Sequence, residues 1–188
     1  GSTAFSSSLA VPLPTGVSDG QTAFIALMYN GSSTTTVSAS GWTRIAQANN
    51  GSDTFMDVFQ GAVSGGQTTE TITLGANRDM SAVSCTTDGS TIGTVGEFNG
   101  TSGSGLTTAP AVVMAEGGMK LAFICFDNRS GSLVCTPTAA LTHQPNDKSS
   151  AKTAAIVAVE DEAAGAGTTI SATHPFNTSC AITIPVNA

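Results

Sequence analysis

Short segments rich in Val, Ile, Thr and Phe recur along the chain, and turn-forming residues separate them. Such segments predict β-strands, because β-branched and aromatic side chains pack well on a pleated sheet. Asn-Gly dipeptides at Asn30, Asn50 and Asn99 lie between them and suit the positive φ angles of tight hairpins. The expected strands are 4–11, 22–29, 43–49, 54–60, 70–74, 80–86, 94–98, 111–114, 120–126, 133–136, 154–160, 168–173 and 179–185.

A weak internal repeat relates the two halves of the chain. Segment 19–27, a turn that runs into an apolar strand, corresponds to 117–125, a shift of 98, and Trp42 corresponds to Leu141, a shift of 99. Segment 58–65 corresponds to 158–165, a shift of 100. The composition of 151–164 favours a helix, but the repeat predicts a strand within it, at 154–160.

The chain is expected to form one domain over residues 1–188, with repeat halves at about 3–99 and 106–188. Only 5% of the residues are aromatic, so each half alone would bury a small core. The predicted fold is all-β, a jelly-roll-like antiparallel β-sandwich with a weak internal two-fold repeat, in which the connections of the halves interleave.

The charge balance argues against two classes of partner. The net charge is −7, with only six Lys and Arg residues and no basic cluster. Nucleic acid and anionic membranes are therefore not expected as partners, because both require clustered cations. No apolar run is long enough to cross a bilayer. Gly1-Ser2 is interpreted as a remnant of cloning, so what precedes it stays open.

The four cysteines, Cys85, Cys125, Cys135 and Cys180, form no Cys-x-x-Cys pair, which argues against zinc and thioredoxin-type chemistry. Two interpretations stay open. Cys125 and Cys135 flank a hairpin-like loop and could form a disulfide, or all four could be buried thiols.

No enzymatic activity and no cofactor are expected. The two histidines, His143 and His174, lie far apart in the sequence, and no Gly-x-Ser-x-Gly motif is present. A Ca²⁺ site is a weak alternative to solvated surface charge, because Ca²⁺ prefers several carboxylates on a loop. Its candidate ligands are the loop residues Asp53 and Asp57 and the strand-end residues Glu160 and Asp161.

Three residues are weak candidates for ligand binding. Tyr29 is the expected exposed aromatic, and Asn30 follows it at a turn. Asp147 belongs to the polar loop 146–150. Trp42 is assigned to the core, because its counterpart Leu141 cannot stack on a sugar. Asp19 is expected to close its own turn through a side-chain hydrogen bond.

Three motifs resemble those of β-sandwich domains in tailed-phage virion proteins. Segment 14–21 reads Pro-Thr-Gly-Val-Ser-Asp-Gly-Gln and matches a "P-x-G-V-x-D-G-D" corner except at Gln21. Segment 38–43, Ser-Ala-Ser-Gly-Trp-Thr, resembles "P-P-x-G-W-T" without its prolines, and 62–65, Ala-Val-Ser-Gly, resembles an "A-x-x-G" turn. These glycines, prolines and the Trp specify turns and core rather than a ligand.

The resemblance implies a bacteriophage structural protein, a capsid decoration, head fibre or tail-fibre domain, which is assembled in the host cytoplasm and carried on the virion. Its implied partners are other capsid or tail proteins, further copies of itself (a trimer) and host surface polysaccharide. The alternative is a cellular carbohydrate-binding module or adhesin domain. A jelly-roll glycoside hydrolase or lyase is a third reading, which the scarcity of aromatic residues disfavours.

Overall fold

The computed structural model describes residues 2–31, 37–51, 54–88, 91–100, 105–115, 117–127, 136–137, 146–148, 153–161, 165–166, 170–174 and 178–187. Every regular element in these residues is a β-strand, and every strand pair is antiparallel. The predicted all-β antiparallel sandwich is therefore confirmed. The jelly-roll description of its connections stays a prediction.

The first sheet is built from residues 2–87 alone. Its spatial order is β1-β6-β2-β5-β4, and β3 also pairs with β6. The strands are β1 (Ser2–Pro12), β2 (Thr22–Asn30), β3 (Val37–Ala39), β4 (Thr43–Asn49), β5 (Thr54–Ala62) and β6 (Thr69–Thr87).

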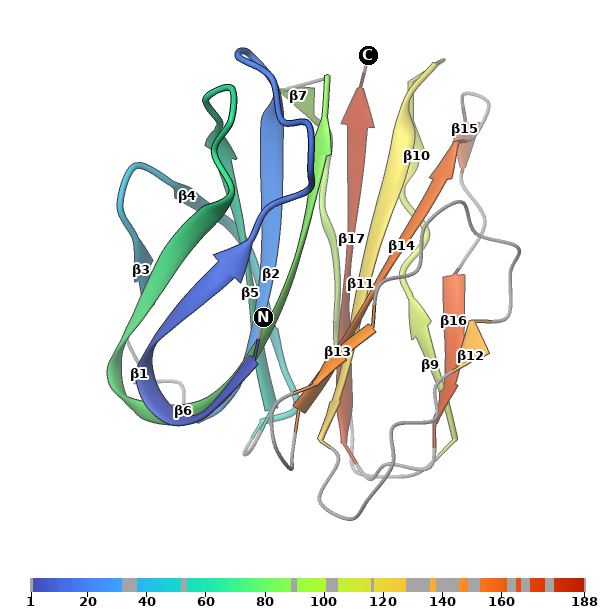
Figure 1. The fold of residues 1–188 in the computed structure, drawn as a ribbon. Helices are drawn as coiled ribbons and strands as arrows, with labels where there is room; N and C mark the ends of the chain where they lie inside the picture. Colours follow the sequence, from blue (N-terminus) through green and yellow to red (C-terminus); the bar gives the residue numbers. More distant parts are fainter. Residues whose placement is uncertain are drawn as a thin grey trace.

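Strand β6 is continuous where the sequence predicted two strands, 70–74 and 80–86. β1 pairs along β6 through a bend, and the register of this pair shifts twice between Thr3 and Ser8. β1 and β6 curve together away from β2 and β5 (Figure 1). The sheet thereby folds over its own apolar core, which includes Leu9, Val11, Ile25, Leu27, Tyr29, Phe55, Phe59, Ile72, Leu74 and Met80.

The facing sheet is built mainly from the second half. Its order is β13-β14-β11-β17-β7, and β8 also pairs with β17. A smaller sheet has the order β12-β16-β9, and β10 pairs with β15. The strands are β7 (Thr91–Ile92), β8 (Gly96–Asn99), β9 (Gly105–Ala109), β10 (Val113–Met114), β11 (Met119–Asp127), β12 (Thr136–Pro137), β13 (Asn146–Lys148), β14 (Thr153–Asp161), β15 (Gly165–Ala166), β16 (Ile170–His174) and β17 (Ser179–Asn187).

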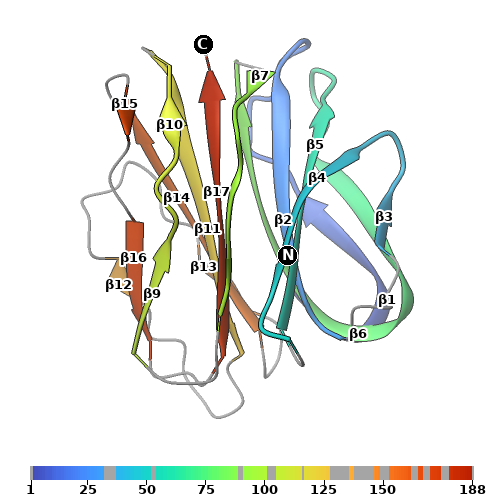
Figure 2. The ribbon, with the colours of Figure 1, turned by 180° about the vertical axis from the view of Figure 1, so that it is seen from behind.

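A shared apolar core joins the two halves. Seen from both sides, β2 and β5 face β17 and β11 (Figures 1 and 2). The core includes Phe24, Met28, Met56, Val58, Val83, Leu121, Phe123, Cys125, Cys180, Ile182 and Ile184. A buried hydrogen bond of 3.1 Å between the hydroxyls of Thr54 and Thr178 adds a polar link. The first sheet is thus covered on both faces at its centre, so β2 and β5 are buried along nearly their whole lengths.

The strand pairing of the first half recurs about 99 positions later. Val37 pairs with Leu74, and Thr136 pairs with Thr173 (37 to 136, 74 to 173). Ser8 pairs with Thr73, and Thr107 pairs with Ala172 (8 to 107, 73 to 172). The repeat detected in the sequence is therefore a repeat of topology.

The ladder between β2 and β6 recurs as the ladder between β11 and β17. Thr22 pairs with Thr87, and Lys120 pairs with Pro185, so the predicted shift of 98 fits the pairing. It does not fit the faces of the strands, because Phe24 lies in the shared core whereas Ala122, its counterpart at that shift, does not.

The second sheet draws on both repeat halves, because β7 and β8, which precede residue 99, pair with β17 of the second half. The strand predicted at 154–160 is confirmed as β14.

Candidate functional site

Tyr29, expected to be an exposed aromatic, lies in the core of the first sheet, so that expectation is wrong. Its side chain is 1% exposed and stacks on Phe55 with ring centroids 5.6 Å apart. The hydroxyl has no hydrogen-bond partner. Burial, reinforced by the charge of Asp57, raises the pKa of this hydroxyl. The ring is inaccessible to a sugar.

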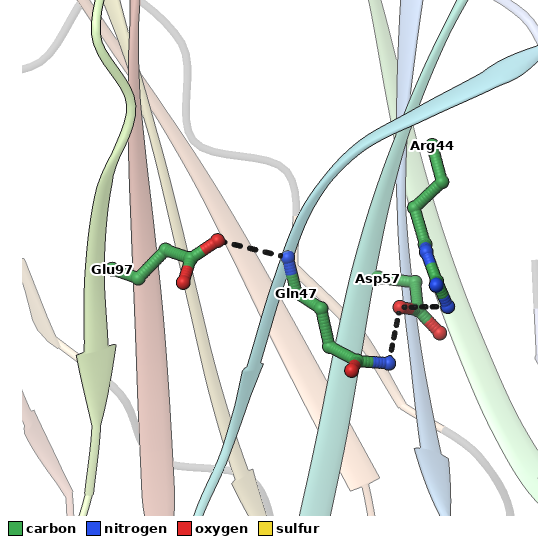
Figure 3. A network of polar contacts seen from close by, with 4 residues as sticks. All are labelled: Arg44, Gln47, Asp57 and Glu97. Atoms are coloured by element: carbon green, nitrogen blue, oxygen red, sulfur yellow. Dashed lines mark hydrogen bonds and ion pairs between the residues drawn. The ribbon is translucent and has the colours of Figure 1, made fainter. Parts of the chain in front are cut away.

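Asp57 lies in β5, within the strand predicted at 54–60, and not on a loop as the calcium hypothesis assumed. Its side chain is fully buried. Its Oδ1 accepts hydrogen bonds from Gln47 Nε2 at 2.8 Å and from Arg44 Nη1 at 3.3 Å (Figure 3). Its Oδ2 has no partner. Because N–H donors already occupy Oδ1, this carboxylate does not resemble a Ca²⁺ ligand, which shares its ion with about six to eight oxygens.

The electrostatics of this cluster are those of an incompletely compensated buried charge. Burial raises the pKa of Asp57, and the Tyr29 hydroxyl, Arg44 and Gln47 act in the opposite direction. No hydrogen bond of standard geometry joins Tyr29 to Asp57, although each group influences the pKa of the other. The Arg44 side chain is 47% exposed, so water screens its charge. Asp57 and Tyr29 are both buried, so neither group is accessible to a substrate in solution.

Side chains of β8 cover the free edge of β4. Glu97 Oε1 accepts a hydrogen bond from the backbone N of Gln47 at 3.1 Å (Figure 3), and Asn99 Oδ1 accepts one from the backbone N of Asn49 at 2.8 Å. Unpaired N–H groups on an edge strand are templates for aggregation. The Glu-x-Asn spacing in β8 thus provides acceptors for the edge N–H groups of β4 and joins the first sheet to the second.

The remaining ligand candidates gather at one end of the sandwich. Asn30 pairs with Thr54, and Asn50 Oδ1 accepts a hydrogen bond from Thr54 N at 2.9 Å. Asn99 pairs with Cys180, which pairs with Cys125, Cys125 pairs with Ala155, and Ala155 pairs with Asp147. We call Asn30, Asn49, Asn50 and Asn99 the asparagine end. Asp147 lies at the same level, in β13.

The calcium candidates do not form one site in the described residues. Glu160 and Asp161 lie at the end of β14 in the second half, whereas Asp57 lies in the first sheet. Asp53, like His143 and Cys135, lies outside the described residues. Among the residues that are described, no group of three His, Cys, Asp or Glu side chains could hold a metal ion.

The phage-like motifs contact one another and the core. Asp19 does not close its own turn, as had been expected: its Oδ1 accepts a hydrogen bond from Gly65 N at 2.7 Å. This bond ties the 14–21 corner to the 62–65 turn. Trp42 is partly buried against the core of the first sheet, and its indole covers Gly61 so closely that a Cβ there would collide with the ring.

Comparison with protein-family models, with curated proteins and with solved structures finds no match to this chain. No helix in the described part of the chain is long and apolar enough to span a membrane. The sequence missed Arg44, Gln47, Glu97 and Asn99 as members of a polar network. The only local signal is the two-residue spacing of Gln47 and Asn49 in β4 and of Glu97 and Asn99 in β8. This spacing predicts a network only once β4 and β8 are known to be neighbours.

Proposed function

We propose that this chain is a non-enzymatic structural component of a tailed-phage particle, a capsid decoration or fibre domain on the virion surface. Its role is to add a stiff, protease-resistant β unit to the shell or tail and to present the strand-connecting loops outward. Its partners are other virion proteins and further copies of itself.

One observation supports the proposal: the motifs that resemble those of virion β-sandwich domains hold turns and strands together in this chain. Asp19 and Gly65 join two turns, and Trp42 packs on Gly61. The described polar groups likewise serve strand edges and the interior, as in Asp57 with Gln47 and in Asn99 with Asn49. Such use of side chains favours a scaffold over a catalyst.

Labelling of intact particles tests this proposal. Particles are purified from a lysate of the phage that encodes the chain and are treated with a gold-tagged antibody against it. We expect the gold label in a regular pattern on the head or the tail. If the chain stays in the particle-free supernatant and labels no particle, the proposal is wrong.

We propose that the asparagine end and Asp147 form the surface that contacts the host. A glycan array tests this part separately. Asn30→Ala and Asp147→Ala are expected to weaken any signal, whereas Tyr29→Phe is expected to leave it unchanged because Tyr29 is buried. Glycan binding by a chain that labels no particle would instead favour the cellular carbohydrate-binding module.

A further inference from the structure

Two cysteines face each other on neighbouring strands of the second sheet, near the asparagine end. Cys125 of β11 and Cys180 of β17 are direct partners in the antiparallel ladder. Their sulfur atoms are 2.8 Å apart and both residues are fully buried in the shared core. The sequence had instead suggested Cys135 as the partner of Cys125.

We propose that Cys125 and Cys180 are an oxidation site that forms a cross-strand disulfide. Directly opposed residues of an antiparallel pair have Cα atoms about 4.5–5.5 Å apart, within the range of about 4.4–6.8 Å that disulfides use. The sulfurs need to approach by only about 0.8 Å to reach a bond length of about 2.05 Å. The backbone therefore already has the spacing that the bond requires.

The oxidant is a low-molecular-weight disulfide such as oxidised glutathione. One cysteine thiolate attacks it and releases one glutathione thiolate, and the second cysteine then attacks the mixed disulfide and releases the other. The protein sulfurs lose two electrons, glutathione gains them, and the two cysteine protons end on the released thiols.

Burial determines when this exchange occurs. Burial, together with the neighbouring Cys125 sulfur, raises the pKa of the Cys180 thiol. The reactive thiolate is therefore disfavoured in the folded protein. The bond forms mainly during folding, before β2 and β5 cover the pair, and the finished core then protects it from reduction.

Cys85 provides a matched control. It is a buried thiol in the same core, where burial raises its pKa to about 12, but its ladder partner is Phe24. Cys85→Ala and Cys180→Ala remove similar volumes, and only the second removes the proposed bond.

The test refolds the reduced full-length chain in a glutathione redox buffer and, in parallel, in dithiothreitol. We expect the first sample to lose about 2 Da and to yield a Cys125–Cys180 linked peptide after digestion with free thiols blocked. Its thermal midpoint should exceed that of the reduced sample by roughly 5–15 °C, because the bond constrains the unfolded chain. Cys85→Ala should keep this difference, and Cys180→Ala should lose it.

The native chain incubated with oxidised glutathione gives a second readout that needs no refolding. The proposal is overturned if no Cys125–Cys180 peptide appears in either experiment. It is equally overturned if the main product links Cys125 to Cys135 or carries glutathione on Cys125 or Cys180. A rise in thermal midpoint that persists in Cys180→Ala would also contradict it.

Discussion

Asp57 shows how much a single residue's environment differs from what its neighbours in the sequence suggest. It lies between Met56 and Val58, which face the shared core, and its own side points into the core of the first sheet. A carboxylate with one unpartnered oxygen in such a place costs stability when it is ionised. Position 57 looked like a surface position, because nothing local reveals that the first sheet is covered on both faces.

Replacing Asp57 with Asn should therefore stabilise the protein at neutral pH. The folded-state pKa of Asp57 is raised. The stability that protonated Asp57 contributes is therefore fully present below about pH 4 and is lost as pH rises through the raised pKa. Asp57→Asn should increase the thermal midpoint by roughly 2–8 °C at pH 7 and by little at pH 4. Thermal scans across this pH range check the prediction. Asp88→Asn, at an exposed position, serves as the control. A thermal midpoint lower for Asp57→Asn than for the unaltered protein at pH 7 would contradict the prediction.

At the scale of strands, segments rich in β-branched and aromatic residues, separated by turn residues, predicted most elements because such side chains pack well on a pleated sheet. The repeat correctly converted 154–160 from a helix-like composition to β14. Continuity of β6 could not be predicted, since the bend depends on pairing with β1. The polar network of Arg44, Gln47 and Asp57 was missed because the register of the β4–β5 hairpin was not predicted, and that register decides which side chains meet.

Trp42 and Gly61 should behave as a coupled pair. Gly61→Ala places a methyl group against the indole and should cost about 1–3 kcal/mol. Trp42→Leu, the residue at the corresponding position of the second half, frees that space. The double variant should thus be more stable than the sum of the single effects predicts. Chemical denaturation of all four proteins measures this, and strict additivity would rule out the contact.

Asn99→Ala should uncover the edge of β4. The backbone N of Asn49 loses its acceptor, so its hydrogen exchange should accelerate by about tenfold or more. The amide of Gln47, held by Glu97, provides an internal control in the same strand. Amide exchange followed by NMR distinguishes the two, and equal acceleration at both positions would indicate general unfolding instead of loss of a specific bond.

At the scale of the whole molecule, the two halves repeat one strand-pairing scheme and share one apolar core. Phe24, Met28 and Val58 of the first copy pack with Leu121, Phe123 and Ile182 of the second. The Thr54–Thr178 hydrogen bond crosses the same boundary. The Gln47–Glu97 and Asn49–Asn99 hydrogen bonds join β4 to β8, and so join the first sheet to the second. Neither half can separate without exposing this core to water.

Differential scanning calorimetry tests this shared core most directly. Two halves that depend on one core must unfold together, so a single transition is expected, with a calorimetric enthalpy equal to the van't Hoff enthalpy. Two transitions, or a calorimetric enthalpy about twice the van't Hoff value, would show that the halves unfold independently and would contradict a single fused sandwich.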